Sequence, residues 1–258
     1  MIKEEEKFSS SCIIEGMSSI SALIKAIEIQ KNDRKILKIL IDLNKKNSKR
    51  REISFLKFKS SALGYEIEFV DPSVIDSMTI GNSHGGIIAE CTERTIPLLD
   101  VDSISENGVY FMFEGIEDPY NFGYSIRSVY AAGCDGVILS PRNWMSAAGV
   151  VARSSAGSSE LIDMFVSEPI NAVELFASRG YKVVCAGIRD SESIFEADLA
   201  KPLLVILGGE KRGISSGLLE KADKIVRIDY GREFGGSLST AAAAAVFAFE
   251  ILRNNPKL

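Results

Sequence analysis

From Gly108 onward, short runs of Val, Ile and Leu alternate with stretches of helical periodicity, and this alternation constrains the fold more than any other feature. Strands are predicted at 109–114, 136–140, 161–166, 181–187, 202–207 and 224–228. Helices are predicted near 121–132, 145–156, 171–179, 215–221 and 237–253. Such apolar strands joined by helices are typical of a mostly parallel sheet covered on both faces. The sequence therefore predicts an α/β domain over residues 107–258.

The N-terminal part of the chain predicts a second, smaller α/β unit. Its expected elements are strands at 12–14, 36–43, 65–70 and from Gly86 to Ala89, and helices at 18–27, at 48–63 and after Pro72. Gly64 follows the second helix, where a glycine commonly ends a helix. The polar stretch that follows contains Pro97 and has weak periodicity. We therefore expect domains at 1–92 and 107–258, joined by a linker at 93–106.

Composition excludes several classes of protein. No apolar run among the 258 residues approaches the roughly 18 needed to span a membrane, so no membrane association is expected. The first seven residues are too charged for a secretion signal. Four widely separated cysteines and one histidine, His84, make a disulfide scaffold and a metal site unexpected, and favour a cytoplasmic location. A catalytic Cys-His pair stays formally open.

Charge is distributed unevenly along the chain. The net charge is −5, yet residues 31–59 contain eleven Lys and Arg against three Asp and Glu, a net +8. We call residues 31–59 the basic segment. Such a segment on an acidic protein is typical of a surface that docks a polyanion, with these candidate RNA contacts: Lys45, Lys46, Lys49, Arg50 and Arg51. A solvated helix face rich in lysine is about equally consistent with the charge alone.

Three loops carry candidate chemistry. The strand at 202–207 leads into Gly208, Gly209 and Glu210, where the glycines would let the backbone approach a ligand closely. Two further groups open predicted helices: Asn121, Gly123 and Arg127, and then Ser237, Leu238 and Ser239. Each has a plain structural interpretation, since Glu210 can be an exposed turn residue, Arg127 a surface residue, and Asn121, Ser237 and Ser239 helix caps. The spacing of a P-loop is absent.

The joint order of these loops resembles the three motifs of the SpoU/TrmH family of SPOUT RNA methyltransferases. The matching positions are Asn121, Gly123 and Arg127, then Gly208, Glu210 and Gly213, then Ser237 and Leu238. Arg153-Ser154-Ser155-Ala156-Gly157 is similar to the family's Arg-x-Ser-x-Gly element. The front domain resembles the family's substrate-binding domain, of a type shared with small ribosomal proteins, at Ile14-Glu15-Gly16 and at Ser83 to Ala89.

The resemblance implies S-adenosylmethionine as methyl donor, a ribose 2′-hydroxyl of RNA as acceptor, a homodimer and a deep C-terminal trefoil knot. Catalytic roles would fall on Arg127, Asn121, Glu210, Ser237 and Ser239, with Arg127 contacting the RNA. The cofactor would be held by these residues: Leu207, Gly208, Gly209, Glu210, Ile228, Tyr230, Ser237 and Leu238. Positioning and electrostatic stabilisation by Arg127 are expected rather than literal general-base action, because guanidinium is almost never deprotonated. A structured loop of rRNA is favoured over tRNA.

The chain departs from the family pattern at three places. Ser239 stands where Asn is usual, Asp229-Tyr230 replaces Pro-Met, and Gly85 replaces Gln. Two alternatives therefore stay open. The chain can be a non-catalytic RNA-binding protein that retains the knot, which cofactor affinity without RNA would distinguish. It can also be an unrelated nucleotide-binding α/β enzyme, which predicts no RNA affinity.

Overall fold

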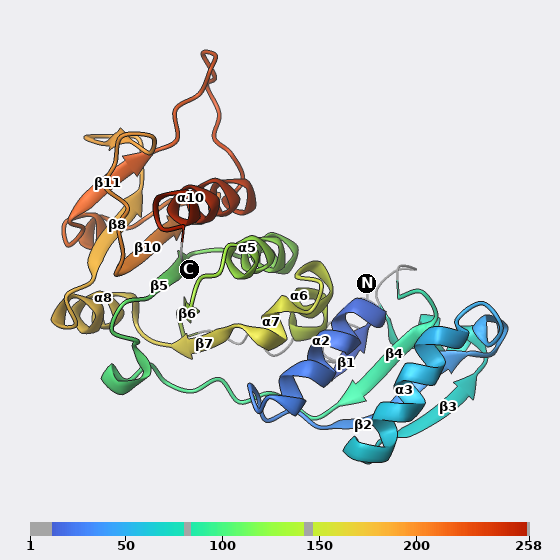
Figure 1. Cartoon of the computed structure of the whole chain (residues 1–258). Coiled ribbons are helices and arrows are strands. Elements are labelled where there is room, and N and C mark those ends of the chain that lie inside the picture. The colour runs from blue at the N-terminus through green and yellow to red at the C-terminus, as the bar shows by residue number, and fades with distance from the viewer. Residues whose placement is uncertain (1–11, 80–83, 142–146, 257–258) are drawn as a thin grey trace. The chain divides into compact units, whose positions relative to one another are not determined.

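The computed structural model describes residues 12–79, 84–141 and 147–256, which fall into two compact units (Figure 1). One unit comprises the chain up to Thr95 together with 143–161, and the other comprises 96–142 and 162–258. The predictions made for the charged N-terminus, for Ser83 and for the start of the helix near 145 lie outside the described residues. Division into domains at 92 and 107 stays a prediction.

The first unit is built on a four-stranded sheet in the order β1-β4-β2-β3. β2 pairs parallel with β3 and antiparallel with β4, which pairs antiparallel with β1. The strands are β1 (Ile13–Glu15), β2 (Ile36–Asp42), β3 (Glu66–Val70) and β4 (Ile87–Cys91), and the helices are α2 (Met17–Glu28), η1 (Leu43–Lys45), α3 (Arg50–Leu63), α4 (Pro72–Met78), α6 (Ala148–Ser154) and α7 (Ser158–Leu161). The predicted front-domain elements are all present within a few residues.

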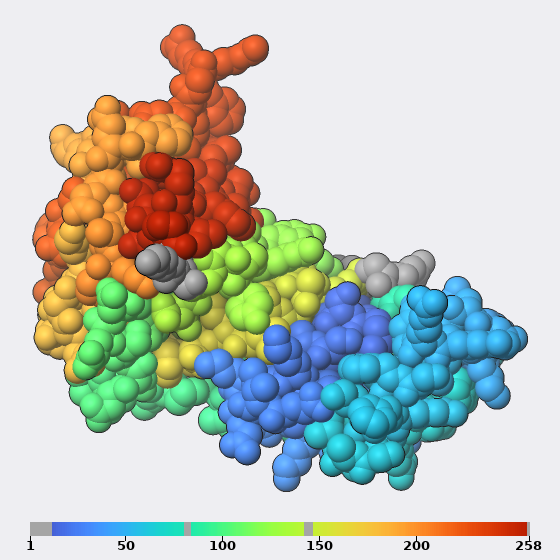
Figure 2. Space-filling view, viewed as in Figure 1, coloured from blue at the N-terminus to red at the C-terminus, as the bar shows by residue number. Residues whose placement is uncertain are grey.

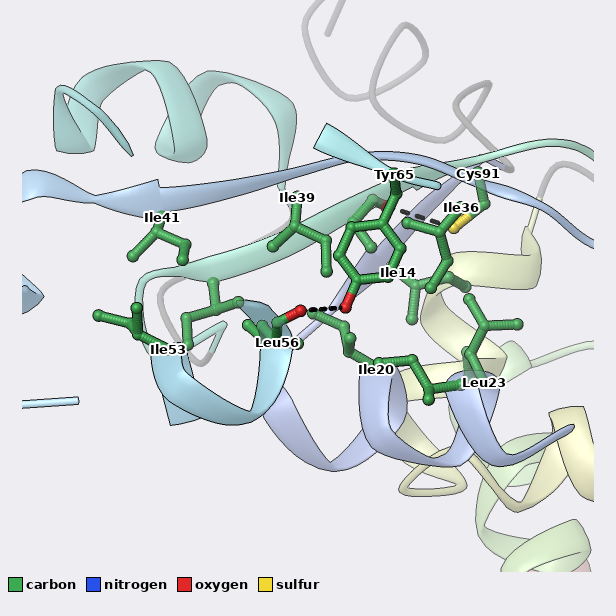
Figure 3. Close-up of a cluster of buried hydrophobic side chains, with 14 residues drawn as sticks. Ile14, Ile20, Leu23, Ile36, Ile39, Ile41, Ile53, Leu56, Tyr65 and Cys91 are labelled. Carbon is green, nitrogen blue, oxygen red and sulfur yellow. Dashed lines mark hydrogen bonds between the residues drawn. The ribbon is translucent and has the colours of Figure 1, made fainter. Parts of the chain in front are cut away.

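Strand alternation divides the apolar side chains of this sheet between two faces. Ile39 and Ile41 belong to the core that α2 and α3 cover, as Figure 3 shows. Leu40 instead packs with Ile75 of α4. Gly64 ends α3 with a φ of 76°, which confirms its predicted role.

Residues 147–161 differ from the prediction, which had one helix to 156 and a strand from 161. The helix is broken by Ala156 and Gly157, which have φ angles of 52° and 83°, and α7 follows. A Cβ on Gly157 would lie 2.4 Å from the Cβ of Ala22 in α2, so the turn requires glycine for close packing. Strand β7 consequently starts only at Asp163.

The second unit is a seven-stranded sheet in the order β7-β6-β5-β10-β8-β11-β9, and every recorded strand pair in it is parallel. Its elements are η2 (Val101–Ser103), β5 (Val109–Glu114), α5 (Pro119–Ala131), β6 (Gly136–Leu139), β7 (Asp163–Val166), α8 (Pro169–Ser178), β8 (Lys182–Ala186), β9 (Glu192–Ser193), β10 (Leu203–Gly208), α9 (Ser216–Leu219), β11 (Lys224–Arg227) and α10 (Thr240–Asn254). The parallel α/β architecture is confirmed, and β9 was not predicted. The knot stays a prediction.

Helices cover both faces of this sheet. Tyr110 and Met112 of β5 pack with α8 and α9, whereas Phe113 of the same strand meets Phe122 of α5 with ring centroids 5.9 Å apart. α10 lies beside α5 on that second face (Figure 1). Within the described ranges, no helix combines the length and the apolar character that a membrane crossing requires.

Candidate active site

The site forms where the adjacent parallel strands β5 and β10 end. Glu114 and Gly208 lie side by side as the last residues of these strands, so the loops that follow leave the sheet at one edge. The amide of Gly209 donates to the carbonyl of Glu114 over 2.7 Å, and the Glu114 carboxylate accepts from the amide of Ser215 over 2.8 Å. The two loops are therefore joined at their bases.

Gly208 and Gly209 allow two loops of the protein to pack closely. A Cβ on Gly208 would lie 2.4 Å from the carbonyl carbon of Gly213, and a Cβ on Gly209 would lie 2.1 Å from the carbonyl oxygen of Gly115. Both positions require glycine because protein backbone approaches there. The expectation that these glycines also let the backbone approach a ligand stays a prediction.

Asn121 and Glu210, predicted to belong to one site, are in contact. The Asn121 side-chain amide donates to the Glu210 carboxylate over 2.8 Å. Asn121 is free to do so because Asp118 caps α5 by accepting from the amides of Tyr120 and Asn121. The alternative that Asn121 is the helix cap is therefore wrong.

A hollow of about 410 Å³ lies beside this contact. Its lining consists of Gly115, Glu117, Asp118, Asn121, Glu210 and Lys211. Lys211 and Glu117 form an ion pair over 2.6 Å, and both side chains are exposed. Three carboxylates and one ammonium therefore surround the opening, which favours a ligand with a cationic group.

The residue that directly follows the third predicted segment connects to the same edge. Thr240, the first residue of α10, donates from its hydroxyl to the carbonyl of Gly208 over 2.9 Å. Ser239 caps α10 by accepting from the amide of Ala242, as its plain structural interpretation required. Residues 230–239 are exposed and form the loop that projects between β11 and α10 in Figures 1 and 2.

The projecting loop carries a small apolar cluster. The rings of Tyr230 and Phe234 meet edge to face with centroids 5.6 Å apart, and the Tyr230 hydroxyl accepts from the amide of Leu238 over 3.2 Å. A Cβ on Gly231 or Gly235 would meet no atom within 4 Å. The cluster therefore has free space beside it.

Asp229, one of the departures from the family pattern, is occupied in holding the base of this loop. Its carboxylate accepts from the hydroxyl of Ser193 and, over 2.8 Å, from the guanidinium of Arg227. The Ser193 hydroxyl, followed by Arg227, holds the pKa of Asp229 below its ordinary value. The carboxylate thus ties β11 to β9.

Other predicted residues are not brought to the hollow. Arg127 is exposed on α5, and neither Arg127 nor Ser237 has a side-chain hydrogen bond or ion pair in the described part of the chain. Arg153, from the segment resembling the Arg-x-Ser-x-Gly element, pairs with Glu15 over 2.9 Å inside the first unit. The roles expected for Arg127 and Ser237 stay predictions.

The candidate RNA contacts lie between the end of η1 and the first turn of α3, where their side chains are mostly exposed. Lys49 pairs with Glu52 over 3.6 Å, and the Lys46 ammonium lies 5.3 Å from the ring centroid of Phe69. Arg50 and Arg51 occupy the first turn of α3, where the helix dipole disfavours cations and favours an anion. The arrangement is suited to phosphate.

Sequence reasoning missed four lining residues of the hollow: Gly115, Glu117, Asp118 and Lys211. Thr240 was missed as well. All five lie within a few residues of predicted motif positions, so the signal was their proximity to two strand ends. No group of His, Cys, Asp or Glu suited to a metal occurs in the described ranges.

Two family models match the chain. The SpoU rRNA Methylase family matches residues 108–249, and the model described as RNA 2′-O ribose methyltransferase substrate binding matches residues 13–97. The putative TrmH family tRNA/rRNA methyltransferase YacO of Bacillus subtilis is 26% identical over 89% of this chain and 93% of its own. The 23S rRNA (guanosine-2′-O-)-methyltransferase RlmB of Shewanella oneidensis is 25% identical over 93% and 96%. A solved AdoMet-bound rRNA methyltransferase from Sinorhizobium meliloti shares the fold, with a TM-score of 0.76 at 20% identity over 97% and 94%.

Proposed function

Because the chain belongs to the SpoU rRNA methylase family, we propose that it transfers a methyl group from S-adenosylmethionine to a ribose 2′-hydroxyl of rRNA. The observation that carries the proposal is the meeting of the motif loops at one sheet edge. Asn121 contacts Glu210, 89 residues away in the sequence, and Thr240 contacts Gly208, 32 residues away, so three segments converge. The relatives named above support the same reaction class.

The residues at this edge fit S-adenosylmethionine. The carboxylates around the hollow suit a sulfonium cation, and the exposed Tyr230 and Leu238 offer apolar surface to a purine. Binding would fall on Leu207 to Glu210, Ile228, Tyr230, Ser237 and Leu238. When bound, the cofactor supplies an electrophilic methyl group.

The protein then has two tasks, since a ribose hydroxyl is a weak nucleophile. It must orient the hydroxyl toward the methyl group, and it must stabilise the charge that develops as the proton leaves. The Asn121–Glu210 hydrogen bond fixes the loops after β5 and β10 relative to each other. Arg127 binds the phosphate beside the target ribose, for which its planar, permanently charged fork is suited. Ser237 and Ser239 position the start of α10.

RNA selection is assigned to the first unit, through Lys45, Lys46, Lys49, Arg50 and Arg51. RNA specificity usually depends on loops with unstacked bases, so the substrate is a structured loop. We further propose a cytoplasmic homodimer with the site near the subunit interface, since Arg127 then acts from or toward the partner. The retained Asn121, Glu210 and Arg127 favour turnover over the non-catalytic alternative.

The test combines the reaction with one substitution. Labelled S-adenosylmethionine is incubated with RNA that lacks this protein's modification, and the product is digested to nucleosides. Label is expected in a 2′-O-methylnucleoside. Arg127→Ala should lower transfer at least about 100-fold, as expected for losing a transition-state contact, with cofactor affinity nearly unchanged. Arg253→Ala, an exposed arginine on α10, serves as the matched control.

Each result bears on a different part of the proposal. Wild-type turnover in Arg127→Ala would overturn the role of Arg127. Cofactor binding by the wild-type protein with no transfer to any RNA would favour the non-catalytic RNA-binding alternative. Absence of both cofactor and RNA affinity would show that this chain lacks the methyltransferase activity of the family.

A further inference from the structure

The outer face of α3 displays two phenylalanines that the fold does not use. Phe58 is 73% exposed and Phe55 is 36% exposed, whereas Ile53 and Leu56 of the same helix are buried in the core. Arg51, Phe55 and Phe58 are spaced four and three residues apart, so they lie on one side of the helix. α3 faces the viewer in Figures 1 and 2. An aromatic strip therefore continues from the cationic first turn.

The two rings are held in place rather than loose. The Lys59 ammonium lies 5.7 Å from the ring centroid of Phe55 and 5.9 Å from that of Phe58. The same ammonium pairs with Glu28 of α2 over 2.5 Å. Because Lys59 is anchored to a neighbouring helix and contacts both rings, it limits their rotamers.

The surroundings of the rings are positively charged. Within residues 43–59, Lys45, Lys46, Arg51 and Lys57 have no ion-pair partner in the part of the chain that the structure describes. Exposed aromatic rings beside free cations are what unpaired nucleic acid requires, because bases stack on rings while phosphates meet cations. A protein partner with a purely apolar surface would leave these cations unpaired.

We propose that Phe55 and Phe58 form a platform on which unpaired bases of the RNA substrate stack while Arg51, on the same side of α3, contacts its phosphates. This inference rests on the proposed function, since it concerns how the same RNA is held. It assigns the aromatic side chains a role separate from that of the basic segment's charges. Stacking depends little on salt, whereas the contribution of the cations falls as salt rises.

The experiment measures RNA affinity of the full chain at several salt concentrations. One probe is a stem-loop with unpaired loop nucleotides, and the other is a blunt duplex of the same stem. The double variant Phe55→Ala/Phe58→Ala should bind the stem-loop about tenfold or more weakly, with an unchanged salt slope, and the duplex as wild type does. Val74→Ala, an exposed apolar residue on α4 across the sheet, is the control.

A second variant separates stacking from general apolar contact. Phe58→Trp should keep the affinity for the stem-loop, whereas Phe58→Leu should lose it, because leucine keeps apolar surface but has no π face. Equal affinity of Phe58→Leu and wild type would overturn the platform. Unchanged affinity of the double variant would do the same and would favour a protein contact on α3. If the double variant binds RNA normally and the wild-type protein transfers methyl groups to RNA, the proposed function stands without this inference.

Discussion

At the scale of single residues, the contact between Asn121 and Glu210 joins two of the motif loops. The amide donates to the carboxylate over 2.8 Å, so an aspartate at 121 would place two negative charges together and separate the loops. Asp118 makes this contact possible by taking over the capping of α5. The motif order was enough to predict that Asn121 and Glu210 are neighbours. The role of Asp118 could not be predicted, because it depends on the residue at which α5 begins.

The cysteines give a prediction at the same scale. Burial raises the pKa of the Cys91, Cys134 and Cys185 thiols to about 12 each. Thiols with raised pKa values stay protonated until the pH approaches 12, and the thiolate is the reactive form. We therefore expect iodoacetamide at pH 8 to leave all three unmodified in the folded protein and to modify them in urea, as measured by peptide mass spectrometry. Alkylation of any of them in the folded protein would contradict their burial. A catalytic role for a cysteine would then have to be considered again.

At the scale of elements, α7 is held to the first unit by a buried ion pair. Arg34 and Glu160 lie 3.0 Å apart with side chains 2% and 4% exposed. Arg34 also donates to the carbonyl of Thr92 over 2.7 Å, and Asn32 donates to the carbonyl of Glu160 over 3.0 Å. The pair thus joins three segments that are far apart in the sequence.

Neutralising one member of this pair should be costly. Glu160→Gln leaves the Arg34 charge buried without its counter-charge, and we expect the free energy of unfolding to fall by about 3–5 kcal/mol in urea titrations. Glu174→Gln breaks the exposed pair with Lys221 and should change the free energy of unfolding by less than about 1 kcal/mol. Equal effects of the two substitutions would show that the buried pair is not what fastens α7.

Prediction of the elements succeeded where apolar periodicity was strong and failed where a tertiary contact decided the backbone. The six strands of the second unit that have four or more residues, and α3, could be located from their patterns. α7 could not, because the break at Gly157 is imposed by the approach of Ala22. β9 could not either, since its two residues are extended only by pairing with β11. The hollow required both loops in place, so only its motif residues could be named beforehand.

At the scale of the whole molecule, charge is segregated. The basic segment carries a net +8, while residues 101–258 carry fifteen basic and twenty acidic side chains, a net −5. Diffusing RNA therefore meets attraction at the basic segment and weak repulsion at residues 101–258. This division of charge suits a protein that captures RNA with one unit and modifies it with the other.

Replacing Lys45, Lys46, Lys49, Arg50 and Arg51 by glutamine should weaken RNA binding and flatten its dependence on salt. If all five contact phosphates, the slope of log K against log salt should decrease in magnitude by about 4. Filter binding over a salt series provides the slope, and α3 helicity by circular dichroism checks the fold. An unchanged slope would indicate that these side chains form a solvated helix face and do not contact the RNA.

The packing of Gly209 against Gly115 limits how this site can be altered. The loops after β5 and β10 approach each other over bare backbone, so any side chain at 209 would force them apart. A change that alters the hollow without separating the loops therefore acts through the side chains that line it, at 117, 118, 121, 210 and 211. The course of the two loops is fixed by their backbone packing, and only the side chains that project from them can be exchanged freely.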